Sequence, residues 1–223
     1  MELKEKFIKY QPISFSEQEI LERSENFYFF MNKRRSLREF SDKPVPKEVV
    51  ENILMTASTA PSGAHKQPWY FCAVGNANLK KKIREAAEQE EQINYESRMS
   101  DRWLKDLEPF ETNWQKPFLE IAPWLIIVFK EVYNHDNEGS KHNNYYVNES
   151  VGLASGMLLT AIHNAGLISL THTPSPMGFF SDILERPSNE RPFLLIPIGY
   201  PADNATVPNL QRKAKTQIMH IFE

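Results

Sequence analysis

The sequence predicts an α+β fold in which several helices surround a small β-sheet. Short runs rich in aromatic and β-branched residues are typical of buried strands, and three stand out: WYFCAV at 69–74, WLIIVF at 124–129 and FLLIPI at 193–198. Longer segments before and between them carry apolar residues at helical spacing. Together these elements define the mixed class.

The first predicted helix covers residues 16–33. Ser16 is a plausible N-cap, and a basic stretch that begins at Lys33 ends the helix. A second helix is expected to begin at Pro46, because proline is favoured in the first turn of a helix. Its apolar residues recur at helical spacing at Val49, Val50, Ile53 and Leu54. The small residues at 60–65 predict a turn before the strand at 69–74.

The middle of the chain contains two charged, amphipathic segments. Residues 78 to about 99 predict a long helix, and residues 101–117 predict a second, broken one. The polar residues 134–144 are expected to form a loop. Residues 145–165 are apolar on nearly all sides, which predicts a central buried helix with Gly166 as its C-cap.

The end of the chain combines strands with a polar tail. A short strand is expected at 167–171. Pro197 lies inside the strand at 193–198 and predicts an edge position or a bulge, because proline has no N–H to donate. The last twenty residues are polar and resemble a tail that needs a surface to pack on. Without internal repeats or linkers, we expect one domain over residues 1–223.

Composition excludes several classes of function. The formal net charge of −3 provides no basic field for nucleic acid and no polybasic patch for a membrane. No apolar run approaches the ~20 residues that span a bilayer, and the N-terminus lacks the apolar core of a secretory signal. Cys72, the single cysteine, cannot form an internal disulfide and is expected to be a buried thiol in a reducing compartment. We therefore expect a cytoplasmic protein.

Short motifs exclude further chemistries. The sequence has no G-x-G-x-x-G, P-loop, H-E-x-x-H or C-x-x-C motif. Its six histidines show no metal-ligand spacing, so no metal site is expected.

An arginine cluster follows the first predicted helix and contains Arg34, Arg35, Ser36 and Arg38. Guanidinium groups bind phosphate oxygens through paired hydrogen bonds, so the cluster suits a phosphate ligand. The alternative is a solvated basic helix end, favoured by the helix dipole, and composition alone favours that alternative.

Two further groups are ambiguous from the residues alone. The small residues 60–65 would let backbone N–H groups approach a flat ring or an anionic oxygen, or would form an ordinary helix-to-strand turn. Glu91 and Tyr95 are spaced i,i+4 and project from one helix face, where they would grip an ammonium group. Lys116 would then supply a cation for a carboxylate. The alternative for this trio is an exposed, charged helix.

Taken together, these stretches resemble the nitroreductase superfamily of flavoproteins and, within it, the iodotyrosine deiodinase family. The resemblance runs from about residue 27 to residue 219. It rests on seven segments, namely RRSLREF (34–40), TAPSGAHKQPW (59–69), EEQINYESRM (90–99), TNW-x-K (112–116), NAGL (164–167), THTP (171–174) and GYPADNATVPNLQRK (199–213).

The resemblance implies FMN as the cofactor and assigns residues to it. Arg34, Arg35 and Ser36 match the segment that binds the FMN phosphate and ring edge, with Arg38 close by. Arg212 matches a late arginine that also reaches the phosphate. The loop beside the flavin is matched by Pro61, Ser62, Gly63 and Ala64.

The resemblance also implies roles at the reacting centre. The hydroxyl of Thr173 matches the threonine that approaches flavin N5 and favours two one-electron steps. The backbone N–H of Ala64 matches a donor to the substrate phenolate. Glu91, Tyr95 and Lys116 match the trio that clamps an amino acid zwitterion, with the first two on the ammonium and the lysine on the carboxylate.

The implied fold is a nitroreductase-like sandwich, in which helices flank a central, mostly antiparallel sheet, assembled as an intertwined homodimer. A lid is expected at about 88–117, and an arm that wraps the partner at about 200–223. Animal members of the family carry an N-terminal membrane anchor, and this chain begins too late for one, which implies a soluble, bacterial-type member. The effect of Pro117, directly after Lys116, is left open.

The implied activity is FMN-dependent reductive dehalogenation of halogenated tyrosines, which releases halide and tyrosine. Electrons would come from an unidentified donor, such as an NADPH-linked reductase, a flavodoxin or a ferredoxin. Two alternatives remain. One is a broad-substrate nitroreductase or quinone reductase, which has no need of Glu91, Tyr95 and Lys116. The other is a protein that binds flavin or halotyrosine without turnover.

Overall fold

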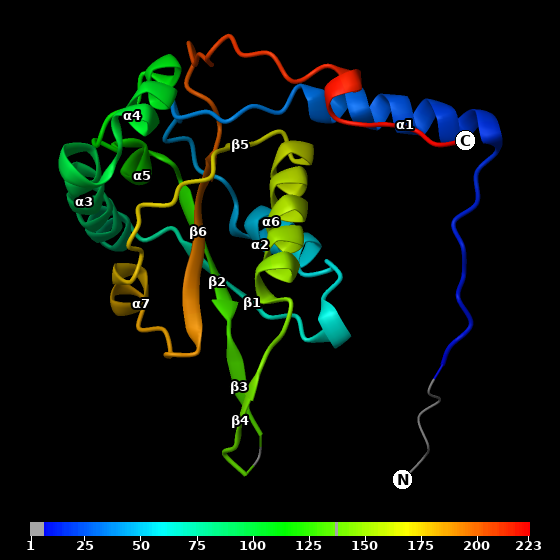
Figure 1. The fold of residues 1–223 in the computed structure, drawn as a ribbon, viewed down its shortest axis with the longest axis horizontal. Helices are drawn as coiled ribbons and strands as arrows, with labels where there is room; N and C mark the ends of the chain where they lie inside the picture. The colour runs from blue at the N-terminus through cyan, green and yellow to red at the C-terminus, as the bar shows by residue number, and fades with distance from the viewer. Residues whose placement is uncertain (1–6, 137) are drawn as a thin grey trace. The chain divides into compact units, whose positions relative to one another are not determined.

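A four-stranded antiparallel sheet lies at the centre of residues 35–223 (Figure 1). Its strands, in the order β1-β2-β6-β5, are Trp69–Val74, Trp124–Glu131, Glu190–Gly199 and Ile168–Ser169. The three strands predicted from apolar runs are confirmed, and β6 extends beyond its run at both ends. The strand predicted at 167–171 is shorter, because only two of its residues pair with β6.

The computed structural model describes residues 7–136 and 138–223, and the chain divides into two compact units, residues 1–34 and 35–223. In the first unit, α1 covers Glu17–Asn32, as predicted. The Ser16 side chain accepts from the Glu19 N–H, and the Glu19 carboxylate accepts in return from the Ser16 N–H, so both unpaired amides at the helix start are satisfied.

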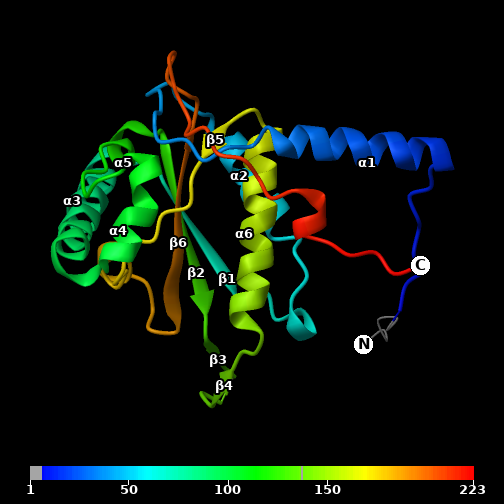
Figure 2. The same cartoon turned by 45° about the horizontal axis from the view of Figure 1, so that its top comes forward.

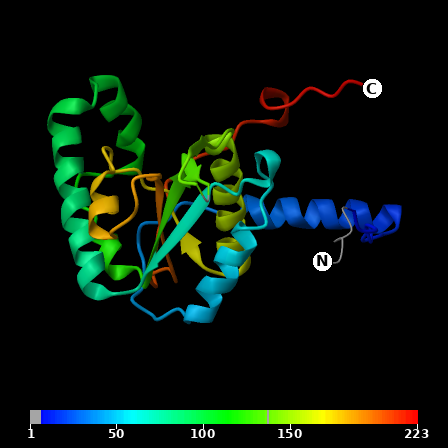
Figure 3. The same ribbon diagram turned by 90° about the horizontal axis from the view of Figure 1, so that it is seen from below.

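Two hydrophobic cores cover the two faces of the sheet (Figures 2 and 3). Ile126 and Val128 of β2 face the core formed with α2 (Lys47–Ala57) and α6 (Val147–Asn164). The alternate β2 residues, Leu125, Ile127 and Phe129, face the core on the side of α3, α5 and α7 (Ala77–Ile93, Phe118–Ile121 and Phe179–Ile183). Because successive side chains point to opposite faces, a strand buried on both sides is apolar without interruption.

The segment after α3 is irregular. The helix predicted at 78–99 ends at Ile93 and continues as a wider π turn, Asn94–Arg98, in which the Met99 N–H donates to the Asn94 carbonyl at 2.9 Å. The broken helix predicted at 101–117 is found as α4 (Asp101–Leu107), a 3₁₀ turn (Glu108–Phe110), a loop and α5.

Two predictions about secondary structure are wrong. A loop was predicted at 134–144, but two short strands lie there: β3 (Tyr133–His135) pairs with β4 (Lys141–Asn143). Its strands have no buried face, so the apolar alternation that reveals a strand is missing. Pro197 was expected at an edge or a bulge, but β6 is a central strand and its register shift lies near Phe193.

The backbone of β6 explains how Pro197 is tolerated. Leu195 exchanges two hydrogen bonds with His172, on the β5 side of the strand. Backbone groups alternate sides along a strand, so Pro197 also faces that side. β5 pairs only with Ile198 and Gly199 there, so the ladder loses no bond.

Helix α6 ends as predicted but is not buried on every side. Gly166 has φ +74°, and the N–H groups of Gly166 and Leu167 donate to the carbonyls of His163 and Ile162 at 3.0 and 3.1 Å. This pattern ends the helix with a left-handed backbone conformation, which glycine adopts without strain. On the opposite face from the core, Leu153 is 53% exposed and lies beside the exposed Gly152 and Gly156.

The tail from residue 200 onward is mostly exposed and contains one short turn, Lys215–Gln217.

Cys72 is half-buried, and burial raises the pKa of its thiol. Among residues 7–136 and 138–223, no helix has both the length and the apolar character needed to cross a membrane.

Candidate active site

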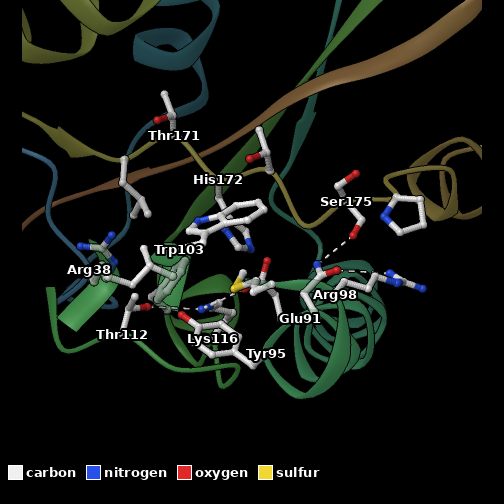
Figure 4. Close-up of a pocket in the computed structure, with 17 residues that line it drawn as sticks. Arg38, Glu91, Tyr95, Arg98, Trp103, Thr112, Lys116, Thr171, His172 and Ser175 are labelled. Atoms are coloured by element: carbon white, nitrogen blue, oxygen red, sulfur yellow. Dashed lines mark hydrogen bonds and ion pairs between the residues drawn. The ribbon is translucent and has the colours of Figure 1, made fainter. Parts of the chain in front are cut away.

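A cavity of about 650 Å³ lies between α3, α4 and the strand segment that follows β5 (Figure 4). It gathers five residues that the sequence singled out, namely Arg38, Glu91, Tyr95, Lys116 and Thr173. Apolar side chains complete the wall, among them Met99, Trp103, Leu107 and Phe118. An enclosure with an apolar wall and a few convergent polar groups suits a small aromatic ligand.

Glu91, Tyr95 and Lys116 lie together at one end of this cavity. Glu91 is in the last turn of α3 and Tyr95 is in the π turn, so their i,i+4 spacing places both on the cavity side. The Lys116 ammonium is 3.4 Å from the Glu91 carboxylate and 5.4 Å from the centre of the Tyr95 ring. The local spacing predicted the first pair, and the return of the chain through α5 brings in the lysine.

This charge pair is buried, since Glu91 is 6% exposed and Lys116 is 3% exposed. Burial raises the pKa of Glu91 and lowers the pKa of Lys116, and the attraction between the two opposes both shifts. A buried ion pair has lost its hydration, so a ligand with its own ammonium and carboxylate can exchange with it charge for charge.

Thr112 belongs to the same group, although no role was predicted for it. Its hydroxyl lies 3.4 Å from the Lys116 ammonium and hydrogen-bonds to Tyr95, which opposes the rise that burial causes in the pKa of Tyr95. Figure 4 shows Thr112, Tyr95 and Lys116 converging. The spacing of Thr112 to Lys116 was visible in the TNW-x-K segment, but only the fold shows that both side chains turn to the cavity.

The segment Thr171–Thr173 forms the opposite wall. His172 is held as a sheet residue by its two backbone bonds to Leu195, at 2.8 and 2.9 Å, so its ring and the flanking threonine side chains point to opposite sides. The ring stacks edge-on against Phe118, with 6.0 Å between ring centres.

The His172 imidazole is buried and neutral. Burial lowers its pKa to about 3, with smaller contributions from the positive charges of Lys116 and Arg38. Its Nε2 atom has no hydrogen-bond partner among the described residues. Sequence reasoning overlooked this residue, because a single histidine between two threonines carries no signal of its own.

Arg38 connects this cavity to a second one of about 470 Å³, lined by Ser36, Glu39, residues 109–111 and residues 206–209. Ser36 lies here because it forms a parallel bridge with Ser169 of β5. The Arg35 guanidinium donates to the carbonyl of Pro208 in the wall of this cavity.

The half-buried guanidinium of Arg38 has no ion pair with any residue in the described part of the chain, and burial lowers its pKa. A desolvated cation that borders two cavities fits an anionic or electron-rich ligand.

The two other predicted arginines lie elsewhere. Arg34 belongs to the first unit, where its N–H donates to the Met31 carbonyl, and Arg212 lies on the exposed tail.

The loop that contains Pro61, Ser62, Gly63 and Ala64 does not reach this cavity. It lies on the other face of the sheet, near the start of α6, where a Cβ on Gly63 would be 3.0 Å from the Tyr146 ring (Figures 1 and 3). Ala64, His65 and Gln67 all have positive φ, between 46° and 55°. Such backbone strain in non-glycine residues concentrates at binding sites, so it agrees with a functional role for this loop.

The comparisons with known proteins agree with this fold. The family model described as "Nitroreductase family" matches residues 31–200, so the chain belongs to the nitroreductase family. The predicted α+β, nitroreductase-like sandwich is thereby confirmed.

Within that family, the chain is similar to iodotyrosine deiodinases. It is 58% identical over 222 residues to the iodotyrosine deiodinase of Haliscomenobacter hydrossis, with 100% of each chain covered. It is 48% identical to that of Hydra vulgaris, covering 99% of this chain and 81% of the relative. A crystal structure of oxidized iodotyrosine deiodinase bound to FMN and 3-iodo-L-tyrosine superposes with a TM-score of 0.76 at 32% identity, covering 87% of this chain and 100% of the other. The predicted resemblance is confirmed.

Proposed function

We propose that this protein is an FMN-dependent reductive dehalogenase that removes halogen from the ring of halotyrosines and releases halide and tyrosine. The observation that carries the proposal is the buried Glu91–Lys116 pair beside Tyr95, in a cavity with an apolar wall. An enzyme that reduces simple nitroaromatics or quinones needs no such pair. The similarity to iodotyrosine deiodinases over the whole chain supports the same substrate class.

Reduced FMN, when bound, would supply the two electrons that, together with a proton, convert the carbon–halogen bond into a carbon–hydrogen bond and release halide. The residues proposed to hold it are Arg34, Arg35, Ser36, Arg38 and Arg212. Two observations support the assignment. The half-buried Arg38 borders the cavity at Ser36, and the Arg35 guanidinium donates to the carbonyl of Pro208 in the wall of that cavity.

The protein's own contribution is to bind and orient the amino acid. Glu91 and Tyr95 accept the ammonium and Lys116 donates to the carboxylate, which fixes the ring in the rest of the cavity. The backbone N–H of Ala64 donates to the phenolate, and the Thr173 hydroxyl faces the flavin. His172 is an unsuitable proton donor near neutral pH, because its pKa of about 3 keeps it neutral.

The active unit is a homodimer with two FMN sites. Three features of residues 35–223 support this proposal. The Ala64 loop lies on the opposite sheet face from the cavity, so a partner is needed to bring such a loop to it. The face of α6 around Leu153 is apolar and exposed. The tail at about 200–223 exposes Ile218, Ile221 and Phe222, as expected of an arm that wraps a partner.

The lid at about 88–117 and the single domain over 1–223 remain proposals. We also propose a cytoplasmic location, supported by the single unpaired cysteine. The electron donor is proposed to be an NADPH-linked reductase, a flavodoxin or a ferredoxin.

Anaerobic turnover tests the proposal. Dithionite-reduced protein is mixed with diiodotyrosine, bromotyrosine or chlorotyrosine, and flavin reoxidation, halide and tyrosine are measured. Free iodophenol is the control without a zwitterion. We expect one halide for each halogen removed, so that diiodotyrosine gives two iodides per tyrosine and the monohalogenated substrates give one halide per tyrosine. We expect the phenol to react slowly. Rapid reduction of nitroaromatics without dehalogenation would identify a general nitroreductase, and binding without reoxidation would identify a binding protein.

A further inference from the structure

Three side chains on one face of α3 bind the segment that carries Lys116. The Lys80 ammonium donates to the carbonyls of Glu120 and Ala122, both at 2.8 Å. One turn later, Arg84 donates to the Glu120 carboxylate at 2.6 Å. Because residues four apart share a helix face, the next position, Glu88, also faces this segment.

Glu88 is bonded through both carboxylate oxygens. One oxygen pairs with the Arg84 guanidinium, and the other accepts from the backbone N–H of Lys116 at 2.6 Å. The Glu88 side chain is only 13% exposed, so solvent competes weakly for these bonds. The contact therefore fixes the main chain of Lys116, whose ammonium contacts Glu91, the Thr112 hydroxyl and the Asn113 carbonyl.

The other side of Lys116 is fixed by the start of α5. Pro117 is the N-cap of this helix with φ −57°, and the Leu119 N–H donates to the Lys116 carbonyl at 3.0 Å. Proline is pre-set for this backbone conformation, which gives Pro117 a role that the sequence left open. Glu88 on one side and α5 on the other leave Lys116 little backbone freedom.

We propose that Glu88 is a positioning residue for halotyrosine binding: by holding the Lys116 backbone it keeps the ammonium opposite Glu91 before any ligand arrives. The inference rests on the proposed function and extends it by one residue that does not touch the substrate. A preformed cation loses less conformational freedom on binding, so the discrimination between a zwitterion and a simple phenol depends on Glu88.

The test uses the FMN-loaded protein and three variants. Glu88→Ala removes the acceptor. Glu88→Asp keeps the charge but shortens the side chain by one methylene, so it no longer reaches the Lys116 N–H. Glu85→Ala is the matched control, because Glu85 lies on the same helix, is 3.9 Å from the Arg84 guanidinium and is 55% exposed, without contact to Lys116 among the interactions described.

Two readouts are measured. The first is hydrogen exchange, without substrate, of the peptide that contains Lys116, which we expect to speed up in both Glu88 variants and to stay unchanged in Glu85→Ala. The second is the ratio of halotyrosine to halophenol affinity, which we expect to fall about tenfold in both Glu88 variants through loss of halotyrosine binding alone.

Unchanged exchange and an unchanged ratio in Glu88→Asp would overturn the proposal, and so would an equal loss of both ligands. If Glu88→Ala does not fold, Glu88→Asp decides alone. Failure of the proposed function looks different: the wild type itself would bind halotyrosine no better than halophenol, whereas the exchange result at Lys116 would stand.

Discussion

The two halves of the candidate site differ in how much of each one chain completes. The clamp, formed by Glu91, Tyr95 and Lys116, is complete in one chain. Glu91 and Lys116 are buried and paired, and neighbouring groups hold them in place. The flavin side is dispersed, with Ser36 and Arg38 at one cavity and Ala64 on the other face of the sheet. On the proposed assignments, one chain contains the whole site for the amino acid, whereas the flavin site needs a loop from the partner.

The largest expected effect tests the completeness of the clamp. Glu91→Gln or Lys116→Gln leaves one buried charge without its partner, which should lower the free energy of unfolding by up to ~3–5 kcal/mol. Affinity for halotyrosine should fall by about ten- to a hundredfold, because a charge-assisted bond contributes ~1.5–3 kcal/mol. Urea denaturation and ligand titration measure the two effects.

Two controls accompany this prediction. Glu96→Gln changes an exposed carboxylate in the adjacent π turn, so neither stability nor affinity should change much. Iodophenol affinity and FMN content should stay near wild type in both clamp variants. Full halotyrosine affinity in both variants would contradict the idea of a clamp and remove the contrast between the two halves.

The next effect concerns the flavin side. Arg35→Ala should weaken FMN retention by about ten- to a hundredfold, since it removes the proposed charge-assisted contact to phosphate. The same substitution should change the stability of the FMN-free protein far less than a clamp substitution does, because within residues 7–136 and 138–223 Arg35 has a bond to the Pro208 carbonyl but no ion pair. Equilibrium dialysis of FMN measures the first effect, with the exposed Arg191→Ala as the control. Wild-type retention in Arg35→Ala would show that the phosphate lies elsewhere.

His172 lies between the halves and gives a smaller effect that depends on pH. Its pKa is about 3 in the folded chain, below the ordinary value near 6.5, because burial, Lys116 and Arg38 disfavour the imidazolium. Between these values the unfolded state binds a proton that the folded state excludes, so stability falls as pH falls. From pH 7 to pH 5 this one group lowers the free energy of unfolding by ~2 kcal/mol.

The variant His172→Leu isolates this term. It should lose less stability than the wild type between pH 7 and pH 5, by that same ~2 kcal/mol, in paired urea titrations. The other titrating groups are unchanged and cancel in the comparison. Parallel pH curves for the two proteins would show that the imidazole is hydrated or paired in solution.

The smallest expected effect sharpens the division of labour inside the clamp. A halogenated hydroxyphenylpropionate has the carboxylate of halotyrosine but no ammonium. In the wild type, Glu91 repels this carboxylate and competes for Lys116 at 3.4 Å. Glu91→Gln should therefore tighten binding of the analogue about three- to tenfold while it weakens binding of halotyrosine. Parallel weakening of both ligands would mean that Glu91 only supports the cavity wall.

The sequence by itself determined what depends on neighbours along the chain. The N-cap at Ser16 and the glycine end of α6 at Gly166 are local, and both were predicted. The run WLIIVF predicted its strand because its last five residues are buried on both faces of the sheet. The i,i+4 spacing of Glu91 and Tyr95 placed both on one side of a helix, and the resemblance in seven segments identified the family.

Tertiary structure decided what depends on contacts between distant segments. The exposed β3–β4 hairpin lacks an apolar face, and Pro197 is tolerated in a central strand only because β5 is too short to face it. The burial of Lys116 against Glu91 and the orphaned Nε2 of His172 arise where α3, α5 and the strand after β5 meet. Such contacts join residues far apart in the chain, and their distance and desolvation follow from packing, which no local pattern of residues encodes.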